Sequence, residues 1–224
     1  MSSLRQLLAQ HPTILLIDSS STVVQVAVLR RDAEPVWIAK PGEAGEQVFA
    51  IATELLEKTN LSLESVEAFV FCDGPGSVLG IRTTAVALRT WCVLRDRPTY
   101  AYCSLTIVAQ ALARAPNRRD FSVIADARRD SWHRVTVDAD GTISNLHRLP
   151  TAELSGPLVM PEGFRHWTEL PASTETVSYS LATLLPQLAD ADLFYAAAEP
   201  DAFLHEEPVY KTWTPQVHRA PSPS

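Results

Sequence analysis

Two aspartates stand where apolar segments end, and the first is followed by hydroxyl side chains. Asp18 closes one apolar run and precedes Ser19–Ser21, while Asp126 closes another. Carboxylates and hydroxyls at the ends of strands can hold Mg²⁺ and the phosphates of a nucleotide between two lobes. The same residue types also form ordinary turns. The pattern is therefore open to both a phosphoryl-transfer site and a structural turn.

A glycine-rich stretch follows the apolar segment 66–71 and precedes the segment 81–95, which lacks Gly and Pro. A strand, a glycine turn and a helix in this order can aim backbone N–H groups at an anion. Alternatively, the glycines let the helix pack closely against its neighbours. No Gly-Lys-Ser/Thr or Gly-x-Ser-x-Gly motif is present, which excludes a P-loop and a nucleophile elbow. The candidate nucleotide or anion site comprises Asp18, Ser20, Gly74, Gly76, Ser77, Arg82 and Asp126.

The remaining residues indicate no catalytic group. The six histidines are scattered without metal-binding spacing, and no spacing marks a Ser/His/Asp triad. The second half of the chain has no counterpart of the glycine loop, and its last glycine is Gly163. We therefore expect no catalytic residues, no metal site and no firmly bound cofactor.

The elements that carry these residues repeat. The segment Ile14–Asp18 and the segment Ser122–Asp126, 108 residues later, both start a three-stranded meander with Asp at the end of its first strand. This predicts an internally duplicated α/β fold whose second copy decays. The polar stretch 116–120 separates a predicted lobe 1–116, which carries the glycine loop, from a reduced lobe 117–224 with a disordered tail.

Two predicted helices, 46–59 and 81–95, are apolar on more than one side. A helix that packs on a single sheet needs only one apolar stripe. The surplus predicts a covering partner, either the other half of the chain or a second subunit. The predicted partner interface consists of Val48, Ala52, Leu55, Ala87, Trp91 and Leu94.

Composition limits the classes of partner. The net charge of −7 argues against nucleic-acid binding by the whole chain. A local contact with tRNA through Arg118, Arg119, Arg128 and Arg129 stays open. The three cysteines form no CxxC motif and cannot all be paired, which favours a reduced, cytoplasmic setting. No apolar run approaches the roughly 20 residues that span a bilayer.

The sequence resembles the TsaB (YeaZ) family at four stretches. These are Ile17–Ser20, Asp73–Arg82, Asp126–Arg128 and Glu207–Tyr210. The resemblance implies an actin-like (ASKHA, ribonuclease H-like) fold of duplicated βββαβα lobes, the second reduced. Proteins of this kind are also called glycoprotease-like or peptidase M22-like. The chain departs from the family at Val78-Leu79, where Phe-Thr is usual.

The resemblance also implies a function. It implies a non-catalytic scaffold for TsaD in making N6-threonylcarbamoyladenosine at position 37 of tRNAs that read codons starting with adenine. Pairing would use the helices 46–59 and 81–95, in a homodimer or with TsaD. A TsaE-type ATPase would join, ATP and Mg²⁺ would bind only in the complex, and tRNA would bind through it. The alternative is an ATP-dependent kinase-like enzyme or a glycoprotease-like peptidase.

Overall fold

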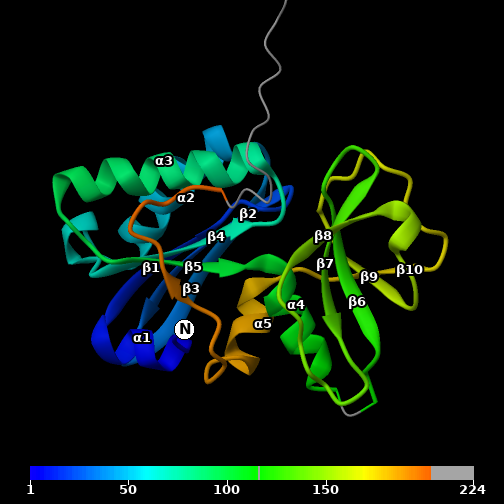
Figure 1. Cartoon of the computed structure of the whole chain (residues 1–224). Coiled ribbons are helices and arrows are strands. Elements are labelled where there is room, and N and C mark those ends of the chain that lie inside the picture. The colour runs from blue at the N-terminus through cyan, green and yellow to red at the C-terminus, as the bar shows by residue number, and fades with distance from the viewer. Residues whose placement is uncertain (116, 203–224) are drawn as a thin grey trace, which may run out of the picture.

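The computed structural model describes residues 1–115 and 117–202. These residues form two mixed β-sheets side by side, with helices on both faces of the first sheet and between the two sheets (Figure 1). The predicted disordered tail and the motif Glu207–Tyr210 lie outside the described residues.

The first sheet has the strand order β11-β5-β4-β1-β2-β3. Strands β1, β2 and β3 form an antiparallel meander, and β4 and β5 extend it in parallel to β1. Its strands are β1 (Thr13–Asp18), β2 (Val23–Arg30), β3 (Ala33–Pro41), β4 (Ala68–Gly74), β5 (Thr99–Cys103) and β11 (Tyr195–Ala196).

The second sheet repeats this order as β10-β9-β6-β7-β8. Its strands are β6 (Phe121–Asp126), β7 (Ser131–Val137), β8 (His147–Pro150), β9 (Leu158–Pro161) and β10 (Thr174–Val177). The repeated order confirms the predicted duplicated, actin-like α/β fold. The third strand of the meander in this sheet, β8, is short, and Ile143 before it makes only an isolated bridge to Val137.

The helices show how the second copy is reduced. In the first lobe, α2 follows β3 and α3 follows β4. In the second lobe, the strands that correspond to β3 and β4 are β8 and β9. The connection after β8 holds only the short 3-10 helix η2, and the connection after β9 is irregular. The helices are α1 (Leu4–Gln10), α2 (Ala44–Lys58), α3 (Val78–Leu94), α4 (Ser104–Ala113) and α5 (Leu181–Gln187), with 3-10 turns η1 (Leu63–Ser65) and η2 (Thr151–Glu153).

The core has two layers separated by the first sheet. Strand β1 is buried on both faces, so Leu15 and Ile17 pack with α2 and α3, while Ile14 and Leu16 face the other way. The second layer continues through α1, α4 and α5 into the second sheet. The two lobes therefore share one apolar layer, and α4 lies between their sheets (Figure 1).

The predicted division at residue 116 assigns residues 195 and 196 to the second lobe, but the described structure places them in the first sheet. After α5 the chain returns to the first sheet, where β11 pairs with β5. Ser2 also bridges to Phe194, next to α1. Helix α1 was not predicted, although Ser3 and Gln6 form a capping box at its start.

Candidate functional site: the cleft between the lobes and the exposed side of α3

The turn between β1 and β2 is sealed inside the protein. Asp18 has no exposed surface. Its Oδ1 accepts from the backbone N–H of Ser20 at 2.9 Å and from the Ser20 hydroxyl at 2.8 Å. Its Oδ2 accepts from Tyr102 at 2.5 Å and from Tyr179 at 2.7 Å. A buried carboxylate that already accepts four hydrogen bonds has no room for a hydrated cation. The structure thus contradicts the predicted place of Asp18 and Ser20 in a nucleotide site and gives them a structural role.

Asp18 holds the two lobes together. Tyr179 belongs to the second lobe, and Gln25 of β2 accepts from the backbone N–H of Leu181 and donates to the carbonyl of Tyr179. Burial, and then the Asp18 carboxylate, raises the pKa of Tyr102 and Tyr179 well above its usual value. Both phenols therefore stay protonated and donate at neutral pH.

The glycine loop packs against the same turn. A Cβ atom on Gly76 would lie 2.4 Å from the carbonyl oxygen of Ser20, and one on Gly80 would lie 2.2 Å from that of Ser19. The backbone N–H of Ser77 donates to Ser20 O at 2.7 Å, and that of Gly80 donates to Ser77 Oγ at 3.2 Å. The loop uses these N–H groups internally. Close packing therefore explains Gly76 and Gly80.

A cavity of about 240 Å³ lies between the glycine loop and the turn that joins β6 to β7. Four of the seven predicted site residues line it, and these are Gly74, Gly76, Ser77 and Asp126. Arg128, which the sequence offered only as a possible tRNA contact, also lines it. Sequence reasoning missed four other polar or aromatic lining residues, which are Asp73, His133, Arg165 and Trp167.

Asp73 is a titratable residue that lines the cavity. It is 8% exposed and accepts a hydrogen bond of 2.7 Å from the Tyr195 hydroxyl of β11. Burial raises the pKa of Asp73 from its ordinary 3.8 to about 6, although the bond from Tyr195 lowers it somewhat. Asp73 can therefore gain or lose a proton close to neutral pH.

Asp126 fastens two segments of the second lobe. Its Oδ1 accepts from the backbone N–H of Arg128, and its Oδ2 accepts from Trp167 and Thr168 at 2.6 and 2.7 Å. Partial burial alone would raise the pKa of Asp126, but the backbone donors outweigh burial and hold the pKa below its usual value. The Asp126 carboxylate therefore connects the turn at Arg128 with the segment at Trp167 and Thr168, at the rim of the cavity.

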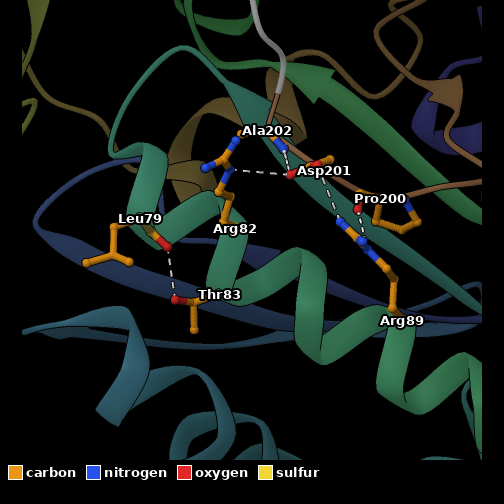
Figure 2. A network of polar contacts seen from close by, with 7 residues as sticks. All are labelled: Leu79, Arg82, Thr83, Arg89, Pro200, Asp201 and Ala202. Atoms are coloured by element: carbon orange, nitrogen blue, oxygen red, sulfur yellow. Dashed lines mark hydrogen bonds and ion pairs between the residues drawn. The ribbon is translucent and has the colours of Figure 1, made fainter. Parts of the chain in front are cut away.

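Arg82, the seventh predicted residue, serves another purpose. Figure 2 shows Arg82 and Arg89 of α3 reaching the segment 197–202, which we call the strap. The guanidinium groups lie 3.7 and 3.5 Å from the two oxygens of Asp201, and Arg89 Nε donates to the carbonyl of Pro200 at 2.7 Å. These side chains are about half exposed, so the ion pairs are weak. The strap covers one flank of α3.

Most of the predicted interface residues are buried within the chain. Val48, Leu55 and Ala87 are 0% exposed and Ala52 is 2% exposed, because α2 and α3 pack them onto the sheet. The rings of Phe49 and Phe69 flank the half-buried Trp91, at 5.8 and 5.7 Å. Only Leu94, at 74%, is as open as an interface residue must be. The predicted surface is therefore corrected.

The exposed apolar surface lies on a different side of α3. Leu79, Val86 and Val93 are 71%, 57% and 86% exposed, and they repeat every seven residues. With Thr83 and Thr90 they follow the 4-3-4-3 spacing of a helix that packs against another helix. We call these five residues the α3 stripe. The spacing of these five residues is present in the sequence, but the predicted interface lay on other faces of the helix, at Ala87, Trp91 and Leu94.

The two threonines do not make the stripe polar. Thr83 Oγ1 donates to the carbonyl of Leu79 at 2.9 Å and Thr90 Oγ1 donates to that of Val86 at 2.8 Å. Hydroxyls that are bonded to the preceding turn are satisfied within the helix. In Figure 2, Leu79 and Thr83 point away from the strap, so the strap does not cover this end of the stripe.

Other classes of site are not found within the described parts of the chain. No group of three or more His, Cys, Asp or Glu there could hold a metal ion. No helix among residues 1–115 and 117–202 has the length and apolar character needed to cross a membrane.

Comparisons with known proteins agree with this fold. Residues 44–146 match the sequence model of the family described as TsaD: tRNA N6-adenosine threonylcarbamoyltransferase. The chain is 29% identical over 121 residues to the tRNA threonylcarbamoyladenosine biosynthesis protein TsaB of Haemophilus influenzae. That match covers 53% of this chain and 51% of the relative, so the chain is matched to about half the length of the Haemophilus influenzae protein.

Two solved structures share the fold. YeaZ from Pseudomonas aeruginosa aligns with a TM-score of 0.56 and 20% identity, over 73% of this chain and 84% of that one. A protein described as uncharacterized, with similarity to peptidase YeaZ from Pseudomonas aeruginosa, aligns with a TM-score of 0.58 and 21% identity, over 79% and 89%. The predicted resemblance to the TsaB (YeaZ) family is therefore confirmed, in sequence by the first relative and in fold by these two.

Proposed function

We propose that this protein is a non-catalytic subunit that binds a TsaD-type partner through the α3 stripe. The partner would make N6-threonylcarbamoyladenosine at position 37 of tRNAs that read codons starting with adenine. The name of the Haemophilus influenzae relative supports this pathway, and the exposed stripe carries the argument for a binding role. Because that relative is matched over only half its length, the activity is a proposal.

The stripe is the right shape for a helix of the partner. From Leu79 to Val93 it runs roughly 20 Å along α3, between the strap on one side and Phe49 of α2 on the other. A continuous apolar surface with this helical spacing is costly to leave in water and is typical of helix packing. Leu94 and the 45%-exposed Phe49 extend it.

The match to the TsaD family model indicates the kind of partner. The stretch that matches the TsaD family, 44–146, contains α2 and α3. A TsaD-type protein would then carry an equivalent helix pair. Two such pairs can meet around an approximate twofold axis, as two identical surfaces do in a homodimer. Self-pairing and pairing with TsaD would therefore compete for the α3 stripe.

A charge placed in the centre of the stripe tests the proposal. We expect Val86→Glu to weaken binding of the TsaD from the same organism by at least about 30-fold, because the carboxylate would be buried without a partner. Trp167→Glu, which puts the same charge on an exposed apolar residue of the second lobe, should bind normally. Calorimetry and size-exclusion chromatography measure both. Wild-type affinity in Val86→Glu would overturn the proposed interface.

The remaining partners extend the same proposal. A TsaE-type ATPase would bind the pair, ATP and Mg²⁺ would bind only in the assembled complex, and the complex would work in the cytoplasm. Equilibrium dialysis of labelled ATP against the single protein and against the complex tests the second point. Equal binding by the single protein would contradict it.

The alternative of an enzyme acting alone is less well supported. A kinase-like mechanism needs a carboxylate that can reach Mg²⁺, and Asp18 is buried with both oxygens occupied. Hydrolysis of ATP or a peptide by the purified protein without any partner would favour the enzyme.

A further inference from the structure

A stacked pair of side chains stands at the rim of the cavity, on the lobe opposite α3. The guanidinium carbon of Arg128 lies 4.0 Å from the centre of the Trp167 ring. Trp167 is nevertheless 61% exposed, and Arg128 is exposed as well. The pair therefore offers solvent a flat, partly cationic surface.

The pair is held rigidly from below. Asp126 accepts hydrogen bonds from the backbone N–H groups of both Arg128 and Trp167, so one carboxylate fixes residues that are 39 positions apart. The side chain of Arg148 braces the same turn by donating to the carbonyls of Ala127 and Arg128. A surface fixed in advance loses little entropy when a ligand binds.

The turn also stores backbone strain. Arg128, Arg129 and Asp130 have φ values of 61°, 50° and 55°, a left-handed conformation that is unfavourable for residues other than glycine. Three such residues in a row need support from the surrounding bonds. The result is that Arg128 leaves the turn at the cavity rim, beside Trp167.

We propose that Arg128 and Trp167 form a stacking site for an unpaired base of RNA. Aromatic rings and guanidinium planes bind bases by their faces, and this is how proteins hold single-stranded RNA. Arg129 follows Arg128 in the chain, is exposed, and could contact the phosphates. This inference rests on the proposed role in tRNA modification and gives the subunit its own contact with the substrate.

The structure separates the four arginines that the sequence grouped as one tRNA contact. Arg118 and Arg119 precede β6, and Arg128 and Arg129 follow it, so a strand of roughly 20 Å lies between the two pairs. Arg118 forms an ion pair of 2.6 Å with Glu175, and Arg119 donates to backbone carbonyls. Of these four arginines, Arg128 is the one that the described contacts place over an exposed ring.

Arg118 provides a matched control, since it lies 5.6 Å from the ring of Phe121, which is only 5% exposed. The probe is a fluorescein-labelled, single-stranded RNA of 12 nucleotides, titrated with the full-length protein and followed by anisotropy. We expect Trp167→Ala and Arg128→Ala to weaken binding about tenfold each, a typical loss for one stacked base. Arg118→Ala should bind normally, and the duplex form of the RNA should bind more weakly. Thermal melts should show that the variants fold, because the changed side chains are at the surface.

Three results would overturn the proposal: unchanged binding by Trp167→Ala, an equal loss in Arg118→Ala, or displacement of the RNA by AMP at the same affinity, which would indicate a mononucleotide site. Val86→Glu separates this test from that of the proposed function. It should lose the TsaD partner and keep the RNA, whereas Trp167→Ala should lose the RNA and keep the partner.

Discussion

Removing the buried charge of Asp73 should change how the stability of the protein depends on pH. Asp73 lies at the end of β4, is 8% exposed, and holds the hydroxyl of Tyr195 at 2.7 Å. We consider Asp73→Asn, which keeps an oxygen that can accept this hydrogen bond and cannot ionise.

The sign follows from the direction of the shift. Burial raises the pKa of Asp73 from 3.8 to about 6 in the folded protein. The folded state therefore holds this proton more tightly than the unfolded state does, and the associated stability is present below pH 4 and is lost as the pH rises through 6. A pKa difference of this size corresponds to roughly 3 kcal/mol of unfolding free energy, which is an upper bound.

Urea unfolding of the wild type and of Asp73→Asn at pH 5 and pH 8 measures the effect. The variant should gain stability relative to the wild type between these two values, by roughly 1 to 2 kcal/mol, because most of the deprotonation of the folded state occurs in this interval. Comparing the two proteins cancels the titration of other groups, such as Asp126, whose pKa is lowered. Parallel pH profiles for the two proteins would refute the reasoning.

Two further predictions concern packing. Gly80→Ala should destabilise the protein by more than about 2 kcal/mol, because the new Cβ atom would lie 2.2 Å from the carbonyl oxygen of Ser19. Gly45→Ala in α2 should stabilise the protein by about 0.5 to 1 kcal/mol, because its Cβ atom would meet nothing within 4 Å. Chemical denaturation of both variants measures this contrast. Tyr179→Phe should lower the unfolding free energy by about 1.5 to 3 kcal/mol, because it removes a hydrogen bond to the buried Asp18 carboxylate. A loss below about 0.5 kcal/mol in the same assay would contradict the role of Asp18 in holding the two lobes together.

The local order of residues was enough to predict the duplicated fold. Alternating or continuous apolar runs that end in Asp18 and Asp126, and the Gly- and Pro-free stretch that forms most of α3, are patterns of neighbouring residues. Such patterns indicate strands and helices directly, because the side-chain period is set by the backbone. The decay of the second copy was visible in the same way, because the second half of the chain has no counterpart of the glycine loop.

Only the tertiary structure decided what those residues do. Asp18 looked like a cation ligand until Tyr102 and Tyr179, 84 and 161 residues away, were found to occupy it. Which side of α3 stays open depends on the strap, a segment more than 100 residues further along the chain. Burial and hydrogen bonding are set by partners distant in sequence, and no local pattern of residue types contains them.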